Sequence, residues 1–263
     1  VIRRLSPGKN EAVKTIAIYN IKGGVGKTAT AINLSFLASL DGANTLLWDL
    51  DPQGAASFYC RIKAEIKGGG KNLIEGKSDI EEAVRGTDYE NLDLLPADFT
   101  YRHMDTLLAQ TKDPVNRFVN LLEPFAEEYD YIFLDCPPSI SSLSEGVFAA
   151  ADLILVPTIP TTLSLRTYQQ IIEFFEQQGI DKNKVLPFFA MVDRRKKMHR
   201  LILQHPPTFM SSLLKSYIPY ASEVERMGQH RAPVTTFAAR SRASQSYTSL
   251  WDELRSYIFA LDT

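Results

Sequence analysis

Short apolar runs alternate with longer amphipathic stretches along most of the 263-residue chain. The apolar runs are rich in branched residues, which is typical of parallel strands buried on both faces. The predicted strands are Thr15–Tyr19, Thr45–Trp48, Leu92–Leu95, Tyr131–Leu134, Leu153–Val156 and Val185–Val192. The predicted helices are Lys27–Ser39, Pro114–Glu128, Thr162–Gln178 and Ser241–Leu261. This alternation predicts an α/β fold, with a mostly parallel central sheet and helices on both faces.

The length and the 44% share of hydrophobic residues suit one substantial core, so we expect residues 1–263 to form a single domain. Residues 193–240 break the strand and helix rhythm with charges and the pair Pro206 and Pro207. We expect a helical, basic lobe there. The triplet Gly68 to Gly70 lies between two lysines, and we expect it to be a surface loop.

Charge and cysteine content narrow the classes of protein. Lys and Arg (29) nearly balance Asp and Glu (31), so any anion site must be local. Cys60 and Cys136 have no metal or disulfide spacing, and we expect them to be buried thiols in a reducing compartment. No apolar run approaches the ~20 residues that cross a bilayer, and no signal peptide is visible. We therefore expect a cytoplasmic protein.

A glycine-rich segment, NIKGGVGKT over residues 20–28, stands between the first predicted strand and the first predicted helix. Backbone N–H groups of such a loop converge on phosphate oxygens, and the helix N-terminus adds its positive end. We expect Lys27 to reach the β- and γ-phosphates and the Thr28 hydroxyl to bind Mg²⁺. ATP and Mg²⁺ are therefore the predicted cofactors.

The part KGGVGKT resembles the deviant Walker A motif of the ParA/MinD family of P-loop ATPases. The resemblance implies the three-layer P-loop NTPase fold and an ATP-sandwich homodimer in which Lys22 crosses to the partner's nucleotide. Lys22 and Lys27 are then catalytic as well as nucleotide-binding. Ala29 stands where the family commonly has a second threonine. The predicted loop contacts are Lys22, Gly23, Gly24, Val25, Gly26, Lys27, Thr28 and Ala29.

Two further segments end predicted strands in carboxylates. Residues 46–54, LLWDLDPQG, resemble the family's first switch region, where Asp51 matches the carboxylate that orients the attacking water. Asp49 either supports Mg²⁺ through a water or holds this loop. Residues 131–138, YIFLDCPP, resemble the Walker B motif, in which Asp135 holds Mg²⁺ through a water. The predicted metal set is Thr28, Asp51 and Asp135.

Residues 218–223, IPYASE, resemble the family's loop that packs on adenine, although Tyr220 and Ala221 replace its basic-polar pair. Met191, Asp193 and Pro219 are the predicted base contacts. The chain is most like the small ParA type, since only about 14 residues precede the first strand and a helix-turn-helix module needs more.

Residues 194–200, RRKKMHR, lie where this family carries its DNA-contacting cations. The resemblance implies nonspecific duplex DNA as a partner in the ATP state, bound through phosphates and not through base edges. The predicted contacts are Arg194, Arg195, Lys196, Lys197, Arg200, Arg226 and Arg231. A solvated helix face is the alternative for such a run.

The favoured function is a nucleoid-associated ATPase that positions a cargo, such as a plasmid, a chromosome origin, a carboxysome or a chemoreceptor cluster, with hydrolysis stimulated by a ParB-like adaptor. The alternative is a MinD-like membrane-surface ATPase, but the amphipathic tail, residues 250–263, carries three acids against one arginine. Electron transfer through Cys60 or Cys136, as in nitrogenase-type iron proteins, and a small-molecule ligase are weaker options.

Overall fold

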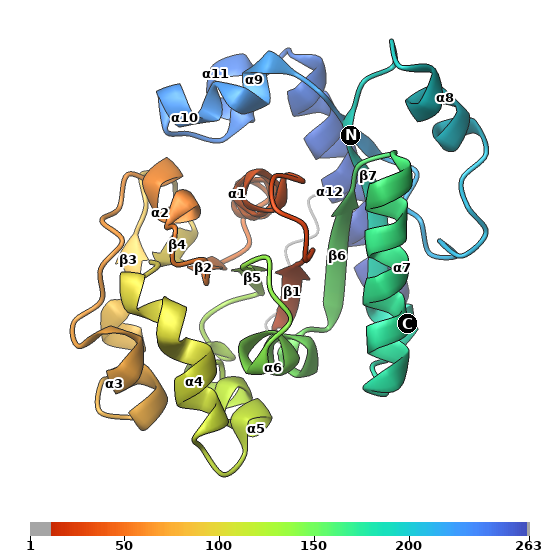
Figure 1. Ribbon diagram of the computed structural model, residues 1–263. Coiled ribbons are helices and arrows are strands. Elements are labelled where there is room, and N and C mark those ends of the chain that lie inside the picture. Colours follow the sequence, from red (N-terminus) through yellow and green to blue (C-terminus); the bar gives the residue numbers. More distant parts are fainter. Residues whose placement is uncertain (1–11, 262–263) are drawn as a thin grey trace.

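The computed structural model describes residues 12–261, and in this range a single eight-stranded sheet runs through the molecule (Figure 1). The strand order is β3-β4-β2-β5-β1-β6-β7-β8, and neighbours are parallel except for the antiparallel pair β3 and β4. The strands are β1 (Lys14–Ile18), β2 (Thr45–Asp49), β3 (Arg85–Gly86), β4 (Leu92–Leu95), β5 (Tyr131–Asp135), β6 (Leu153–Thr158), β7 (Val185–Val192) and β8 (Tyr217–Pro219). The predicted fold class is confirmed.

Helices cover both faces of the sheet. They are α1 (Lys27–Leu40), α2 (Ala55–Tyr59), α3 (Gly69–Glu75), α4 (Met104–Ala109), α5 (Pro114–Val119), α6 (Ser142–Ala150), α7 (Thr162–Gln177), α8 (Lys197–Gln204), α9 (Ser222–Glu225), α10 (Met227–His230), α11 (Val234–Ala238) and α12 (Arg242–Leu261). Short 3-10 turns are η1 (Glu81–Ala83), η2 (Phe99–His103), η3 (Glu123–Phe125) and η4 (Lys182–Lys184). None of the helices in the range 12–261 combines the length and the apolar character needed to cross a membrane.

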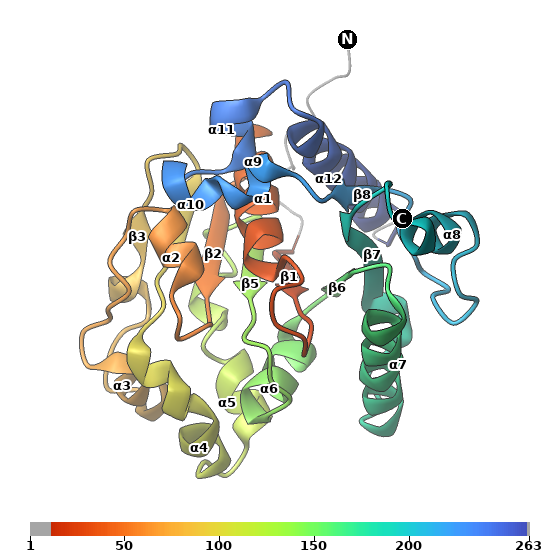
Figure 2. The same cartoon turned by 45° about the horizontal axis from the view of Figure 1, so that its top comes forward.

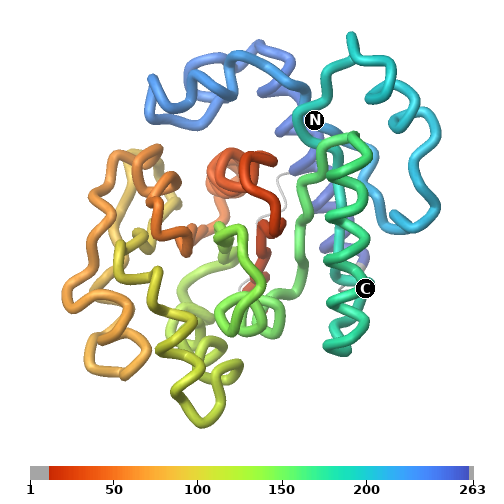
Figure 3. The backbone as a smooth tube through the Cα atoms, viewed as in Figure 1, coloured from red at the N-terminus to blue at the C-terminus, as the bar shows by residue number. Residues whose placement is uncertain are grey.

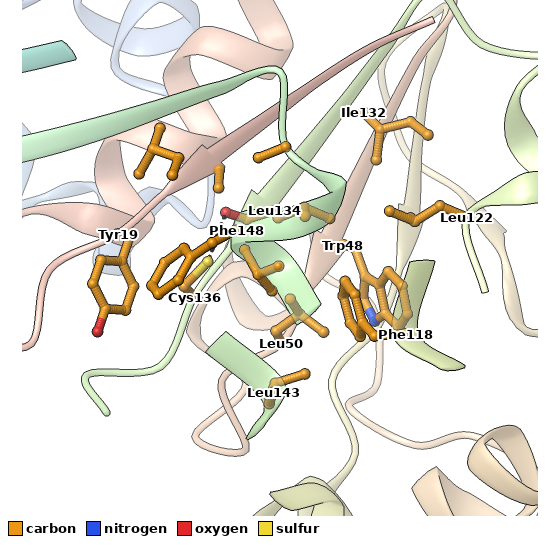
Figure 4. Close-up of a cluster of buried hydrophobic side chains, with 14 of the residues drawn as sticks. Tyr19, Trp48, Leu50, Phe118, Leu122, Ile132, Leu134, Cys136, Leu143 and Phe148 are labelled. Atoms are coloured by element: carbon orange, nitrogen blue, oxygen red, sulfur yellow. Dashed lines mark hydrogen bonds between the residues drawn. The ribbon is translucent and has the colours of Figure 1, made fainter. Parts of the chain in front are cut away.

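Two hydrophobic clusters, one on each face, stabilise this arrangement. Helices α3 to α7 pack into one cluster, where the rings of Trp48 and Phe118 stack 5.4 Å apart (Figure 4). Helices α1 and α12 pack into the other cluster on the opposite face. Successive β1 residues alternate between them, since Ile16 and Ile18 join the second cluster and Ala17 the first. This is the period-two pattern of a strand buried on both faces.

All six predicted strands are present, with ends within two residues of the prediction. Strands β3 and β8 were not predicted, because two or three residues carry too little periodicity. The predicted helix Pro114–Glu128 is wrong in its second half: α5 ends at Val119 and only the turn η3 follows. Pro124 lies in that turn and cannot donate the backbone hydrogen bond that a continuous helix requires.

The expectation of a surface loop at Gly68 to Gly70 is also wrong. Gly69 and Gly70 open helix α3 and both are buried. A Cβ atom on Gly69 would lie 2.6 Å from Thr100 Oγ1, and one on Gly70 would lie 2.9 Å from the Tyr101 ring. These glycines therefore serve close helix packing.

The segment 193–240 carries helices α8 to α11 and also strand β8, which extends the sheet beside β7. In Figure 3, the tube passes from β7 out through α8 at one side of the molecule and returns through α9 to α11 over α1 and α2. The loops that follow β1, β2 and β5 lie at one edge of the sheet, because β5 pairs in parallel with both β1 and β2. That edge of a parallel sheet is where ligands of α/β proteins bind.

Candidate nucleotide-binding site

The loop between β1 and α1 surrounds open space. Gly24 and Gly26 have φ angles of +70° and +95°, a left-handed backbone that favours glycine. A Cβ atom added to Gly23, Gly24 or Gly26 would meet no atom within 4 Å. No side chain of the described residues caps the N-terminus of α1, so its first N–H groups can receive an anion.

A buried asparagine and a buried lysine hold this loop. Asn20 donates from Nδ2 to the Pro157 carbonyl (2.9 Å), and its Oδ1 accepts from the Lys22 N–H (2.8 Å). Lys27 is only 7% exposed and its Nζ donates to the Lys22 carbonyl at 3.3 Å. Burial lowers the pKa of Lys27, while the negative charge of Asp135 acts to raise it. Lys27 forms no ion pair within residues 12–261, and a triphosphate would supply an anionic partner.

Asp49 and Asp135 lie directly opposite each other at the ends of β2 and β5. Burial, followed by repulsion from Asp49, raises the pKa of Asp135, and the Thr28 hydroxyl and Lys27 act to lower it. Neither carboxylate oxygen of Asp135 makes a hydrogen bond of normal geometry within residues 12–261. An unpartnered buried carboxylate next to a hydroxyl group suits a cation.

Asp49 instead holds the following helix. Its Oδ2 accepts from the Ser57 N–H (2.7 Å) and from the Ser57 hydroxyl (2.8 Å). Burial raises the pKa of Asp49 to about 6, although the two bonds from Ser57 oppose the shift. Of the two roles expected for Asp49, this geometry favours the loop-holding one.

Asp51 lies in the turn between β2 and α2 and is half-buried. Its Oδ1 accepts from the Gln53 N–H at 2.9 Å, and its carbonyl accepts from the Gly54 N–H at 2.9 Å. Its charge acts on the pKa of Lys27, as does that of Asp135. The fold therefore brings Lys27, Thr28, Asp51 and Asp135 into one site.

The donor set fits Mg²⁺ bound together with a nucleotide. Within residues 12–261, no three His, Cys, Asp or Glu side chains could hold a metal ion by themselves. Mg²⁺ commonly uses one or two carboxylates and takes its remaining ligands from phosphates and waters. The Thr28 hydroxyl and the unpartnered oxygens of Asp135 are among the protein groups available for that arrangement.

A small cavity of about 50 Å³ adjoins the loop on the side expected to take the base. Val25, Gly26, Met191, Pro219 and Tyr247 are among its lining residues. Met191 has a φ of +53°, a strained conformation for a residue with a side chain. The structure thus brings the predicted base contacts Met191 and Pro219 together beside the phosphate loop.

Asp193 lies in a different depression, a groove of about 490 Å³ that Lys22 and Tyr220 also line. Its carboxylate is bound by Arg195, with Nε 2.9 Å from Oδ1 and Nη2 3.0 Å from Oδ2. This ion pair lowers the pKa of Asp193 to about 2. The third predicted base contact is therefore engaged with Arg195.

Sequence reasoning missed two residues around the site. Tyr247 reaches the cavity from α12, and no motif marks it. His199 belongs to the basic run and would be expected in solvent, yet it is buried and its Nδ1 accepts from the Asp193 N–H at 3.0 Å. Only the tertiary contact distinguishes His199 from its charged neighbours.

The predicted DNA contacts fall into two groups. Five of them, residues 194–197 and 200, are exposed where β7 leads into α8. Arg200 binds the carbonyls of Arg194 and Arg195, at 2.9 and 3.0 Å. Arg226 and Arg231 lie at α10, on the opposite side of α1 (Figure 1). Arg231 is engaged there, because its Nε donates to the Phe58 carbonyl at 2.9 Å.

The C-terminal helix α12 uses its apolar face within the fold. Leu250, Trp251, Leu254 and Ile258 are buried in the cluster that also contains α1. Trp251 donates from Nε1 to Asp41 at 2.8 Å. Both Cys60 and Cys136 are unbridged and buried, as expected.

Comparison with known proteins supports the same picture. The family described as "AAA domain" matches residues 13–187, more than half of the chain. The chromosome partitioning protein ParA of Myxococcus xanthus is 30% identical over 247 residues, which cover 92% of this chain and 87% of that protein. The sporulation initiation inhibitor protein Soj of Bacillus subtilis is 29% identical over 247 residues, covering 92% of this chain and 98% of that protein.

Among solved structures, the putative plasmid partition protein of Borrelia burgdorferi bound to AMPPNP superposes with a TM-score of 0.80. The match covers 93% of this chain and 99% of the other, at 20% sequence identity. This similarity shows that the two chains share a fold.

Proposed function

The chain belongs to the ParA/MinD family of P-loop ATPases, so it is an ATP hydrolase that uses ATP and Mg²⁺, and we propose that it is a cytoplasmic positioning ATPase whose ATP-bound homodimer holds nonspecific duplex DNA. The observation that carries the proposal is the meeting of an open glycine loop, buried Lys27 and unpartnered Asp135 at one sheet edge. Release follows hydrolysis, stimulated by an adaptor that links the protein to its cargo.

We assign a part to each residue at this edge. Lys27 and the N–H groups of the loop would bind the phosphates, while Thr28 and Asp135 would hold Mg²⁺, which would offset phosphate charge. Asp51 orients the attacking water. Met191 and Pro219 contact the base.

Lys22 makes hydrolysis depend on dimerisation. It is half-buried at the rim of the phosphate loop and lines the groove next to Asp193. We place its ammonium group on the nucleotide of the partner subunit, where a cation supplied in trans stabilises charge on the transferred phosphoryl group. ATP binding and dimerisation are then one linked equilibrium.

The exposed cations beside α8 are the proposed DNA surface. The side chains of Arg194, Lys196 and Lys197 are exposed, and none of the three makes a hydrogen bond or ion pair within residues 12–261. Phosphate contacts of this kind are individually weak, but a dimer presents two such surfaces, and avidity raises the affinity. The burial of the apolar face of α12 speaks against a membrane-binding tail.

The first test is binding of the protein to a nonspecific duplex with ATP, with ADP and without nucleotide, at two salt concentrations. We expect salt-sensitive binding with ATP alone. Arg194→Glu combined with Lys197→Glu should abolish it, whereas the same charge change at exposed Lys67 and Lys112, on the α3 to α5 side, should not. Dimerisation by ATP without DNA binding in any state would refute the DNA part and leave the ATPase.

The cargo and the adaptor are separate questions. Plasmid, chromosome origin, carboxysome and chemoreceptor cluster all fit the proposed cycle equally. Stimulation of hydrolysis by the product of a neighbouring gene would identify the adaptor, and its other ligand would identify the cargo.

A further inference from the structure

Two arginines join the helix after the Asp51 turn to the segment that follows the base cavity. Helices α2 and α10 lie side by side (Figures 1 and 2). Arg231 donates from Nε to the Phe58 carbonyl at 2.9 Å, and its guanidinium carbon lies 4.6 Å from the centre of the Phe58 ring. In the reverse direction, Arg61 donates from Nη2 to the His230 carbonyl at 3.1 Å. We call Phe58, Arg61, His230 and Arg231 the arginine clasp.

The backbone at both arginines is unusual. Arg61 has a φ of +61° and Arg231 a φ of +49°, and neither is glycine. Residues with side chains persist in this region only where the surroundings hold them there. A planar guanidinium group can hydrogen-bond a carbonyl and stack on a ring at once, which Arg231 does here. The clasp is therefore a specific, doubly anchored contact between two short helices.

On one side, the clasp holds the turn that carries Asp51. Helix α2 begins one residue after Gly54, whose N–H donates to the Asp51 carbonyl. Ser57 in the same helix donates both its N–H and its hydroxyl to Asp49. A displacement of α2 would therefore displace Asp51.

On the other side, the clasp holds the segment that reaches the base cavity and the phosphate-loop helix. Val224 and Glu225, just before α10, line the base cavity. Asn33 of α1 is buried, accepts from the Val234 N–H at 2.9 Å and donates to the Ala29 carbonyl at 2.7 Å. Residues 224–234 thus contact the nucleotide site from the base side.

We propose that Arg61 and Arg231 are positioning residues for ATP hydrolysis. By fixing α2 to α10, they make the position of Asp51 depend on the segment beside the base. The inference rests on the water-orienting role proposed above for Asp51. This proposal assigns Arg231 a role in positioning α2 against α10 in place of a DNA contact.

The test is single-turnover ATP hydrolysis by Arg61→Ala, Arg231→Ala and the double variant, without DNA or adaptor. Because no DNA is present, a lost DNA contact cannot change the rate. We expect each single variant to lower the rate constant by ~10–100-fold, as for loss of a charged hydrogen bond, and to change the ATP dissociation constant less than ~3-fold. The double variant should be no slower than the singles, since either change opens the clasp.

Arg117→Ala is the matched control. Arg117 also joins two helices, donating to the carbonyls of Ile74 (2.6 Å) and Leu73 (3.2 Å), but it lies away from the site. The Arg117→Ala variant should hydrolyse ATP at the wild-type rate. Arg231→Lys keeps one donor for the Phe58 carbonyl and should recover most of the rate.

Hydrogen exchange gives an independent measure. In the wild type, ATP should protect residues 52–62 and 222–234 together, and in the alanine variants protection of 52–62 should be lost while 222–234 stays protected. Wild-type rates in both alanine variants, or equal losses of rate, ATP affinity and thermal stability, would overturn the proposal. Asp51→Ala, tested in parallel, distinguishes a failure of this proposal from a failure of the role proposed for Asp51. Hydrolysis at the wild-type rate by Asp51→Ala would refute that role.

Discussion

Replacing Asp49 by asparagine should stabilise the nucleotide-free protein, and the gain should depend on pH. The Asp49 side chain is fully buried, and burial raises its pKa from the ordinary 3.8 to about 6. Folding therefore favours the protonated acid, so the contribution of Asp49 to stability falls as the pH rises from about 4 to 6 and is level above that. Asparagine keeps an oxygen that can accept from Ser57 and carries no charge.

The size of the effect follows from the pKa. Each pH unit of difference in pKa is worth about 1.4 kcal/mol. The rise from 3.8 to about 6 therefore lowers the free energy of unfolding of the wild type by about 3 kcal/mol at pH 7.5. At pH 4.5, where most of the wild-type carboxyl is protonated in the folded state, the same reasoning gives about 1 kcal/mol. Asp49→Asn should therefore gain roughly three times more stability at pH 7.5 than at pH 4.5.

The assay is urea unfolding of both proteins at several pH values between these limits, without nucleotide. A gain of equal size at all pH values would show that charge burial is not its cause, and a loss at pH 7.5 would refute the reasoning outright.

Ser57→Ala is the companion variant. It removes a donor to Asp49 and the acceptor of the Ala97 N–H (2.9 Å), so it should destabilise the protein by about 1–2 kcal/mol.

Four other substitutions test separate parts of the site. Lys27→Ala should weaken ATP binding by ~100-fold or more in calorimetry, because a charged contact to phosphate is lost. Lys22→Gln should retain ATP but lose hydrolysis and ATP-dependent dimerisation, measured by phosphate release and light scattering; intact turnover would remove Lys22 from the reaction. Met191→Gly should relieve a φ of +53° and be stability-neutral or better in urea, yet weaken ATP binding several-fold. Gly54→Ala should destabilise by about 1–3 kcal/mol and slow hydrolysis, since φ is +67° and the new Cβ would lie 2.9 Å from Ala64 Cβ.

Local patterns in the chain were enough to predict the main strands of the sheet and the glycine loop before α1. Buried parallel strands are continuous apolar runs, so β1, β2 and β4 to β7 could be recognised individually. The phosphate loop is equally local, because its glycines, Lys27 and Thr28 are consecutive and their backbone conformation depends on few distant contacts. The carboxylates Asp51 and Asp135 could be placed at the same edge since both follow parallel strands.

Features that depend on distant partners could not be predicted. The glycines of α3 resemble a flexible loop until Thr100 and Tyr101 are seen to pack against them. A run of cations gives no sign that His199 is buried. Nor does it show that Arg195 binds Asp193.

The sequence by itself determined the fold class, the order of the main strands and the residues of the phosphate loop, because these depend on neighbours in the chain. Only the tertiary structure decided which charges are engaged. Arg231, one of the predicted DNA contacts, donates to a carbonyl 173 residues away in the sequence. The sequence left two roles open for Asp49, at the end of β2, and only its contact with Ser57 favours the loop-holding one. The role of a charged side chain is set by burial and partners, and folding alone brings these together.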